Sequence, residues 1–279
     1  MTRKKMSPLE IAEMCKRMRL CAMEMALFAG QRGAHISGSL SCIEIYAVLY
    51  GCILNFDSQN PLWEERDRYI AGKEHARLAE FPAMAEMGII SREILHSYES
   101  NDGVLVGHPR NLKLGIEYSS MSLGMGLSFA VGKAIIAKQT GKNYRIFTLL
   151  GDAECEEGSI LEAFSTASHY SLDNLTIIID RNYMSVDGNT EELMAQRDMA
   201  EKLKTFGWET VSVDGHDIIA LIDALEYHPV GKPYAVIAKT IKGKGVSFIE
   251  NNKSWHQAIL SEAHYKQAID EIKGVSLCQ

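Results

Sequence analysis

Two short apolar runs in the middle of the chain predict its architecture. They are IFTLL at 146–150 and LTIII at 175–179, and neither alternates between apolar and polar residues. Short runs of branched residues are typical of strands that are buried on both faces of a parallel sheet. The segment between them, 157–170, carries apolar residues at helical spacing. The pattern therefore predicts a strand–helix–strand unit, with a polar group of residues following each strand.

These polar groups, GDAE at 151–154 and DRN at 180–182, contain the first candidate chemistry. Asp152 and Asn182 are hard oxygen donors, and each is predicted to follow a different strand. Open α/β sheets bind their ligands at the carboxyl ends of their strands, and Mg²⁺ or Ca²⁺ held there leaves room for phosphate oxygens. Alternatively, Asp152 caps the following helix and Asn182 makes a turn. Both interpretations stay open on this pattern alone.

The rest of the chain alternates between helical and strand patterns. Ser7 and Pro8 are typical of a helix start, and Ser41 with Glu44 suggests a capping box. Helices are predicted at 8–28, 41–50, 76–89, 91–100, 124–139, 191–207, 217–228 and 261–272, and further strands at 69–71, 208–213 and 233–241. This alternation predicts an α/β fold with a doubly wound, mostly parallel sheet and helices on both faces. No repeat or linker interrupts the chain, so we expect one domain over residues 1–279.

Composition narrows the possible partners and the compartment. The 279 residues carry a net charge of −7 without a basic stripe, which argues against nucleic acid as a partner. No apolar run reaches the roughly 18 residues of a membrane span, and charged residues interrupt the N-terminal segment where a signal peptide would have its core. The six cysteines form no CxxC pair, which favours a reducing compartment. We expect a cytoplasmic protein that does not bind membranes.

Several further positions are candidates on local grounds only. His35 lies in a loop rich in glycine and serine, His108 precedes a proline, and His256 lies in the long loop 242–257. A single loop histidine is more often incidental than functional. Gly124 and Gly126 allow close backbone approach at a helix start that can face an anion, although small residues that open a tightly packed helix give the same pattern.

Taken together, the motifs resemble those of one family. GDAECEEGSILEA followed by DRNYMSVDGNT resembles the thiamine-diphosphate motif of transketolases. The resemblance continues, in transketolase order, through GAHISGSLSCIEIYAVLY, RDRYIAGKEHA, VGHP, SSMSLGMGLSFAVG, KTIKGKG and NNKSWH. It implies the thiamine-diphosphate-binding fold. The chain has about half the length of a one-chain transketolase and therefore resembles its N-terminal, diphosphate-binding module. The resemblance implies a separate C-terminal subunit with the pyrimidine-binding module, an α2β2 assembly, and no activity without that partner.

The resemblance also implies the ligands of the cofactor. Asp152, Asn182 and the backbone carbonyl of Met184 would hold Mg²⁺ or Ca²⁺, which would bridge the diphosphate oxygens. The other residues expected to contact thiamine diphosphate are His75, His256, Met121, Leu123, Gly151, Ala153, Glu154 and Asn182.

Catalytic roles follow from the same resemblance. His35 and His108 would face the sugar donor, and His256 would lie near the reacting centre. Glu157 and Glu162 match acidic residues that line a proton path between two cofactor sites, although exposed acids in the first turns of a helix would look the same. The implied reaction transfers a two-carbon ketol unit from a ketose, or ketose phosphate, to an aldose through thiamine diphosphate.

Three residues depart from the family pattern, because Glu74, Met121 and Ala153 stand where the family carries glycine. A glutamate near a diphosphate is unfavourable unless its side chain points outward. These changes are compatible with a specialised transketolase for a branched or sulfonated sugar. The α-subunit of a 2-oxo-acid dehydrogenase and a non-catalytic subunit also stay open. Against the dehydrogenase, the chain lacks a paired asparagine at Asn182 and has a transketolase-like loop around His35.

Overall fold

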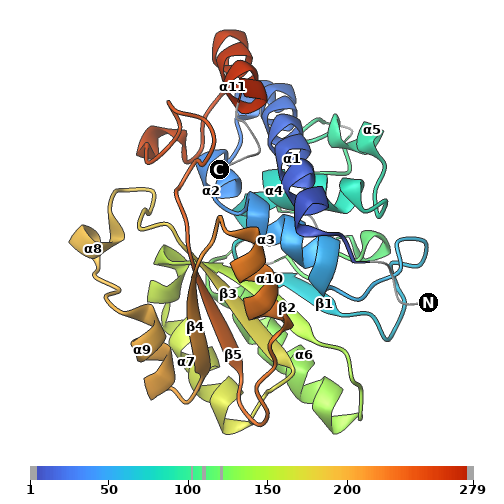
Figure 1. Cartoon of the computed structure of the whole chain (residues 1–279), viewed down its shortest axis with the longest axis vertical. Coiled ribbons are helices and arrows are strands. Elements are labelled where there is room, and N and C mark those ends of the chain that lie inside the picture. Colours follow the sequence, from blue (N-terminus) through green and yellow to red (C-terminus); the bar gives the residue numbers. More distant parts are fainter. Residues whose placement is uncertain (1–4, 102, 109–110, 120–121, 275–279) are drawn as a thin grey trace.

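A five-stranded parallel sheet forms the centre of the protein (Figure 1). The computed structural model describes residues 5–101, 103–108, 111–119 and 122–274. The strands are β1 Arg68–Ala71, β2 Ile146–Gly151, β3 Leu175–Arg181, β4 Glu209–Asp214 and β5 Tyr234–Lys239, in the order β1-β2-β3-β5-β4. Every neighbouring pair is parallel. All strands therefore end at the same edge, and the predicted fold class is confirmed.

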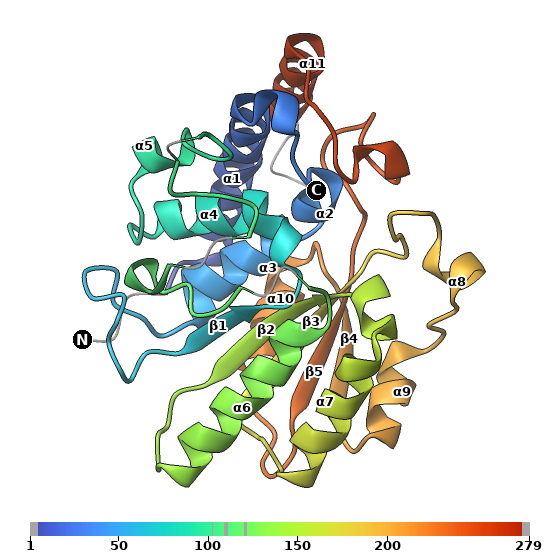
Figure 2. The same cartoon turned by 180° about the vertical axis from the view of Figure 1, so that it is seen from behind.

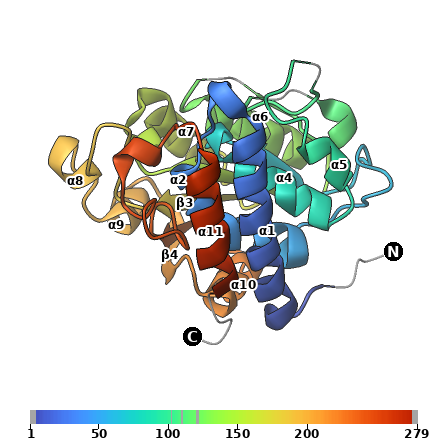
Figure 3. The same ribbon diagram turned by 90° about the horizontal axis from the view of Figure 1, so that it is seen from above.

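Helices cover both faces of this sheet (Figures 1 and 2). One face packs against α6 Met125–Gln139, α7 Gly158–His169 and α9 Met199–Thr205, and the other against α3 Ile43–Val48, α4 Arg77–Glu86 and α10 Ile218–Glu226. Beyond this second layer, α1 Pro8–Phe28 and α11 Glu262–Gly274 lie side by side (Figure 3). The short helices are α2 Ser37–Leu40, α5 Arg92–Leu95 and α8 Thr190–Leu193. Within the described residues, no helix combines the length and apolar character needed to cross a membrane.

The buried side chains of β2 explain why its sequence does not alternate. Phe147 and Leu149 join the hydrophobic cluster on the α3 and α10 side, whereas Ile146 and Leu150 join the cluster on the α6 and α7 side. Successive side chains of a strand point to opposite faces, so a strand between two helical layers needs apolar residues at almost every position. Burial on both faces accounts for the continuous apolar run seen in the sequence.

The predicted start of the first helix is confirmed. Ser7 Oγ accepts a hydrogen bond from the backbone N–H of Glu10 at 3.3 Å, and the Glu10 carboxylate accepts one from the N–H of Ser7 at 2.7 Å. Pro8 follows the cap, where its missing N–H is not needed. This reciprocal capping satisfies two backbone donors at the start of α1.

The capping box predicted at Ser41 and Glu44 is wrong. The helix predicted over 41–50 begins only at Ile43, as α3, and continues as a π-helical turn over Leu49–Ile53, while Ser41 lies between α2 and α3. Ser41 Oγ instead donates to the Asp180 carboxylate at 2.7 Å, and the Glu44 carboxylate accepts from Arg19 and contacts His216 Nδ1 at 3.1 Å. Both side chains are buried, so tertiary partners take precedence over the local cap.

The single helix predicted over 191–207 is also wrong, because α8 and α9 are separated by an extended turn. The Glu191 carboxylate accepts hydrogen bonds from the backbone N–H groups of Gln196 (3.0 Å) and Arg197 (3.1 Å). Asp198 then starts α9 by accepting from the N–H of Glu201 at 3.1 Å. The backbone N–H groups between the two helices thus donate to the side chains of Glu191 and Asp198 instead of to helical carbonyl oxygens. This exchange ends α8 and begins α9.

Gly126 brings the beginning of α6 against the end of β1. A Cβ atom at this position would lie 2.6 Å from the carbonyl oxygen of Ala71 and 2.8 Å from Cα of Gly72. Backbone atoms cannot move aside as a flexible side chain can, so only glycine allows this approach. The contact places the first turn of α6 at the carboxyl edge of the sheet.

We predict that Gly126→Ala lowers the free energy of unfolding by about 1–3 kcal/mol, because the added methyl group forces the helix away from β1. Urea unfolding followed by circular dichroism measures the change. The matched control is Gly132→Ala in the same helix, where a Cβ atom meets nothing within 4 Å. That variant should be stabilised by about 0.4–1 kcal/mol. Equal stability of the two variants would contradict the close approach at Gly126.

Candidate functional site

Three histidine side chains meet at the carboxyl edge of the sheet. His35 precedes α2, His75 lies in the turn after β1, and His256 lies in the long loop after β5. Their ring centroids are separated by 5.4 Å (His35–His75), 5.4 Å (His35–His256) and 5.3 Å (His75–His256). Residues more than 200 positions apart in the sequence therefore form one cluster.

Lys73 and Lys242 lie near these histidines, and the five side chains form a crowded basic site. Burial and neighbouring positive groups lower the pKa of His35 to about 4 and that of His256 to about 3, and the pKa of His75 falls well below its ordinary value. Burial and the nearby Lys73 ammonium lower the pKa of Lys242 to about 8. Burial is the main cause of these low pKa values and nearby positive groups add to it, so an anion bound here would favour the charged lysines.

Asp180, at the end of β3, is the buried acceptor that holds this edge together. Its carboxylate pairs with Lys73 and accepts hydrogen bonds from the side chains of Ser41 (2.7 Å), Cys42 (3.2 Å), Asn182 (2.8 Å) and Thr240. Burial by itself would raise the pKa of Asp180, but the Lys73 ammonium and these donors outweigh it and lower that pKa to about 2. Asp180 is therefore ionised and fixes the direction of both Lys73 and the Asn182 amide.

The three predicted metal ligands lie in one small region beside this carboxylate. Asp152 Oδ2 accepts from the N–H of Tyr183 at 2.7 Å and from Arg181 at 3.1 Å, and Asn182 Oδ1 accepts from the N–H of Met184 at 3.0 Å. The carbonyl oxygen of Met184 accepts from the Lys242 ammonium at 2.9 Å. Burial, followed by the neighbouring Asp180, raises the pKa of Asp152. The structure thus gathers hard oxygen donors next to cationic side chains, which is a donor set that suits Mg²⁺ or Ca²⁺.

Glu154 has a side-chain role that the sequence did not suggest. The resemblance implies only a contact with thiamine diphosphate, but the buried Glu154 carboxylate accepts from the N–H groups of Gly124 and Gly151, both at 3.0 Å. Burial outweighs these bonds and raises the pKa of Glu154 to about 7. The carboxylate ties the start of α6 to the end of β2. The N–H of Ala153 donates to Asp152 Oδ1 at 2.9 Å, so residues 151–154 are held by hydrogen bonds among themselves.

Two buried polar atoms at this edge lack a partner. Within the described part of the chain, Ser37 Oγ and His256 Nδ1 make no hydrogen bond. Buried polar atoms are almost always hydrogen-bonded, so such an atom beside the basic cluster indicates a polar ligand there. A phosphorylated ligand with a metal ion would give His256 Nδ1 a hydrogen-bond partner. It would also balance the positive charge of the cluster.

Comparison with known proteins identifies the family. Residues 11–274 match the family described as "Transketolase, thiamine diphosphate binding domain". The chain is 40% identical over 243 residues to an apulose-4-phosphate transketolase subunit of Actinobacillus succinogenes, and the match covers 86% of this chain and 88% of that one. It is 36% identical over 242 residues to 6-deoxy-6-sulfo-D-fructose transketolase subunit SqwG of Clostridium sp. (strain MSTE9), with 86% and 88% covered. The chain belongs to the transketolase family.

The solved transketolase of Campylobacter jejuni has the same fold, with a TM-score of 0.88 at 29% identity. The match covers 96% of this chain but only 44% of that one, so this chain corresponds to less than half of the Campylobacter enzyme. The matched region is a thiamine-diphosphate-binding domain. The crowded basic groups, the hard oxygen donors and the unpartnered His256 nitrogen fit a diphosphate ligand with its metal ion.

Other predicted residues of the transketolase site lie around this cluster or outside the described chain. His108 lies beside Glu74, with 3.0 Å between His108 Nδ1 and Glu74 Oε2, and close enough to His35 to influence its pKa. Leu123 is exposed immediately before α6. Met121 lies outside the described residues. We expected Glu74 to point outward if a ligand were to bind, but it is buried and directed toward His108.

Glu157 and Glu162 are exposed at the start of α7. Glu157 stands at the cap position of that helix, and its side chain makes no capping hydrogen bond there within the described residues. Their expected role in a proton path therefore depends on groups from outside this chain and stays a prediction.

Four charged residues of this site were not predicted from the sequence: Lys73, Asp180, Arg181 and Lys242. Each follows or ends a predicted strand, just as Asp152 and Asn182 do. Lys73 follows β1, Asp180 and Arg181 end β3, and Lys242 follows β5. A systematic search for charged residues at strand ends would have found all four.

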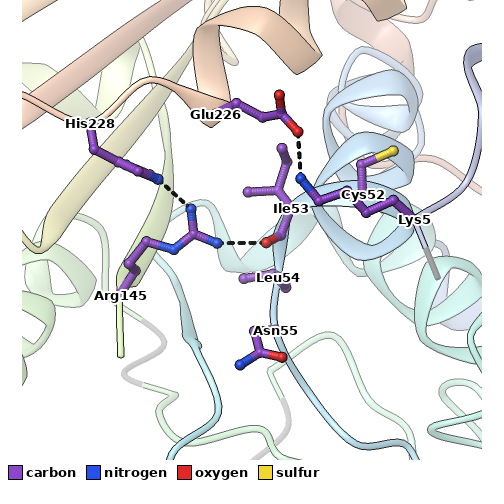
Figure 4. Close-up of a pocket in the computed structure, with 8 residues that line it drawn as sticks. All are labelled: Lys5, Cys52, Ile53, Leu54, Asn55, Arg145, Glu226 and His228. Carbon is purple, nitrogen blue, oxygen red and sulfur yellow. Dashed lines mark hydrogen bonds and ion pairs between the residues drawn. The ribbon is translucent and has the colours of Figure 1, made fainter. Parts of the chain in front are cut away.

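A separate pocket of about 370 Å³ lies at the opposite edge of the sheet, where Arg145 precedes β2 (Figure 4). Its charged side chains already have protein partners. Arg145 binds the Asp67 carboxylate, the carbonyl oxygen of Ile53 and His228 Nε2, and Lys5 pairs with Glu226. Because these charges are satisfied within the fold, the pocket is a weaker candidate for the transketolase ligand than the carboxyl edge.

We predict that Asp180→Ala lowers the free energy of unfolding by about 3–5 kcal/mol, because it leaves the Lys73 ammonium buried without its counter-charge. The matched control is Asp173→Ala just before β3, where the carboxylate pairs with Lys138 and both side chains are about a third exposed. Loss of that pair should cost roughly 1 kcal/mol or less. Chemical unfolding of both variants measures the contrast, and a similar small loss in each would contradict the importance of the buried pair.

Proposed function

We propose that this chain is the diphosphate-binding subunit of a two-chain transketolase that depends on thiamine diphosphate. The assembled enzyme transfers a two-carbon ketol unit from a ketose donor to an aldose acceptor. The observation that carries this proposal is the convergence of three imidazoles, two lysines and three oxygen donors at the carboxyl edge of the sheet. The names of the two relatives, both described as transketolase subunits, support it.

In this proposal, Asp152, Asn182 and the Met184 carbonyl would hold Mg²⁺ or Ca²⁺. The Lys242 ammonium, which donates to the Met184 carbonyl, would supply positive charge for the phosphate groups. Lys73 remains fixed on Asp180 and adds positive charge behind the site. When bound, the cofactor supplies the carbon nucleophile and the electron sink that carbon–carbon cleavage requires.

The protein contributes uncharged hydrogen-bonding groups around the sugar. Because the pKa values of His35 and His256 lie at about 4 and about 3, both imidazoles are neutral at pH 7. A neutral imidazole has one donor and one acceptor nitrogen, so it can orient a hydroxyl group and hold a proton at a defined atom. His256 Nδ1, which has no partner within the described residues, is available for such a bond.

A partner subunit would complete the site. Apolar side chains are exposed around the carboxyl edge: Leu123, Met125, Tyr183, Val186 and Met194. Exposed apolar groups beside a half-formed site are typical of an interface, and this chain matches only 44% of the Campylobacter enzyme. We propose that a C-terminal subunit with the pyrimidine-binding module docks here in an α2β2 assembly. Glu157 and Glu162 would then line a proton path between the two cofactor sites.

The sugar is the least constrained part of the proposal. Relatives of this chain are named for apulose 4-phosphate and for 6-deoxy-6-sulfo-D-fructose. Together with the departures at Glu74 and Ala153, these names favour a specialised transketolase over one for ordinary pentose phosphates. We place the enzyme in the cytoplasm, with support from the cysteines at 15, 21, 42, 52 and 155, which form no disulfide.

We predict that Asp152→Ala weakens Mg²⁺-dependent binding of thiamine diphosphate by about 100-fold or more, because it removes the only carboxylate among the proposed ligands. Isothermal titration of the reconstituted pair, with and without Mg²⁺, measures the effect. The control is Asp187→Ala, an exposed carboxylate in the neighbouring loop, which should bind as the native chain does. Unchanged affinity in Asp152→Ala would refute the metal assignment.

The proposed activity is tested by assaying the chain, with a C-terminal partner subunit, on a panel of ketose donors. The panel contains ketose phosphates, a branched ketose phosphate and a sulfonated ketose, each with an aldose phosphate as acceptor. We expect ketol transfer that requires both chains and thiamine diphosphate, with a preference for a branched or sulfonated donor. A reconstituted pair that binds no thiamine diphosphate would instead identify a non-catalytic subunit.

A further inference from the structure

Arg181 is a buried arginine at the end of β3 that contacts a proposed metal ligand. Only 2% of the residue is exposed. One guanidinium nitrogen, Nη1, donates to Asp152 Oδ2 at 3.1 Å and to Thr190 Oγ1 at 2.9 Å. The other nitrogen, Nη2, donates to the Glu191 carboxylate. A cation beside a carboxylate competes with a metal ion for the same negative charge, so the place of this arginine requires an explanation.

Glu191 shares the guanidinium of Arg181 with Asp152. Its carboxylate also accepts from the backbone N–H groups of Gln196 at 3.0 Å and Arg197 at 3.1 Å, so the loop after α8 holds it in place. One guanidinium thus serves two carboxylates that lie on different nitrogens of its planar fork. Its main effect on Asp152 is therefore to orient the carboxylate, because part of its charge is taken up by Glu191.

The two carboxylate oxygens of Asp152 are used differently. Oδ2 accepts from Arg181 and from the N–H of Tyr183, whereas Oδ1 accepts, among the described residues, only from the N–H of Ala153. A carboxylate oxygen offers two lone-pair sites. Both sites of Oδ2 are therefore occupied, and Oδ1 keeps one for a metal ion. Asp152 is thus held as a ligand that binds through one oxygen only.

Arg181 also holds the loop that carries the Met184 carbonyl. Its guanidinium carbon lies 4.1 Å from the centroid of the Tyr183 ring, and the N–H of Thr190 donates to the carbonyl oxygen of Tyr183 at 2.9 Å. Met184 and Asn189 pair as an isolated antiparallel bridge between these two residues. The backbone of Tyr183 is left-handed, with φ of 62°, which a residue other than glycine adopts only where its surroundings hold it. Two of the three proposed metal ligands are therefore positioned by one side chain.

We propose that Arg181 is a positioning residue that makes this site select Mg²⁺ over Ca²⁺. The inference rests on the proposed function, because it concerns the metal ion of the cofactor. Mg²⁺ demands near-ideal octahedral geometry with short bonds, whereas Ca²⁺ takes about six to eight oxygens in flexible geometry and often binds both oxygens of one carboxylate. Arg181 occupies Oδ2 of Asp152 and so opposes two-oxygen binding. It also limits how far the Met184 carbonyl can move to fit a larger ion, and both effects favour Mg²⁺.

The hold of Arg181 on this region is tested without any cofactor, by amide hydrogen exchange of the full chain measured with NMR. The reporters are the N–H groups of Tyr183 and Thr190, which donate within this network. We expect both to be protected in the native chain and to exchange about ten-fold faster, or more, in Arg181→Gln. The matched control is Arg197→Gln, an exposed arginine of the same loop, which should exchange as the native chain does. Unchanged protection in Arg181→Gln would overturn the proposal.

The selectivity is tested by titrating the reconstituted pair of subunits with thiamine diphosphate in the presence of either Mg²⁺ or Ca²⁺. We expect tighter binding with Mg²⁺ in the native pair. In Arg181→Gln the ratio of the two affinities should shift toward Ca²⁺ by about ten-fold, because Oδ2 of Asp152 becomes available. Arg181→Lys keeps the charge but can reach only some of the partners of the fork, so it should lie between the two. Arg197→Gln should keep the native ratio.

An equal loss of affinity with both metals would overturn the proposal, because it would show that Arg181 supports the fold in general and not the choice of metal. Arg181→Lys serves for both measurements if Arg181→Gln does not fold. A native pair that binds no thiamine diphosphate with either metal would refute the proposed function, and this inference with it. Intact binding with an unchanged metal ratio in the Arg181 variants would refute the inference alone, so the two failures are distinguishable.

Discussion

The ion pair between Asp180 and Lys73 is the interaction on which the candidate site depends. Both groups are buried, and the carboxylate receives further bonds from Ser41, Cys42, Asn182 and Thr240. These donors come from α2–α3, the end of β3 and the loop after β5, so one carboxylate joins three segments at the carboxyl edge. Because an unpaired buried charge is costly, the pair stabilises the fold only when all of these segments are in place. Assembly of the site is thereby coupled to folding of the sheet.

The same interaction explains the electrostatics of the cluster. Lys73 is neutralised by Asp180, yet it still lowers the pKa values of Lys242, His75 and His256. The three imidazoles are neutral at pH 7, so the fold tolerates this crowding without several uncompensated charges. The Lys242 ammonium, with a pKa of about 8, stays mostly charged at pH 7 and supplies positive charge that suits a diphosphate.

Patterns that depend on burial were predictable from the sequence. The runs 146–150 and 175–179 became central strands, and the polar residues after them met at one edge, because parallel strands end together. Asp152 and Asn182 could be selected for this reason. The two wrong predictions, the capping box at Ser41 and the single helix over 191–207, have a different origin. Ser41 and Glu191 look like local helix-forming residues, but each is bonded to a partner on another segment, Asp180 and Arg181 respectively. Pairings of this kind depend on the fold and cannot be derived from spacing along the chain.

Glu74 shows how a departure from a family pattern acquires meaning only in three dimensions. From the sequence, an acid in place of glycine beside a diphosphate site suggested repulsion and weaker binding. The fold instead buries the side chain, with its Oε2 atom 3.0 Å from His108 Nδ1 and its Oε1 atom 3.9 Å from the Arg77 guanidinium. The contact partner of Glu74 is therefore a ring at the candidate site, and the oxygen donors of the proposed metal site, Asp152 and Asn182, keep their own hydrogen bonds. A change of residue type that looks unfavourable beside a ligand can thus be accommodated by a partner elsewhere in the fold.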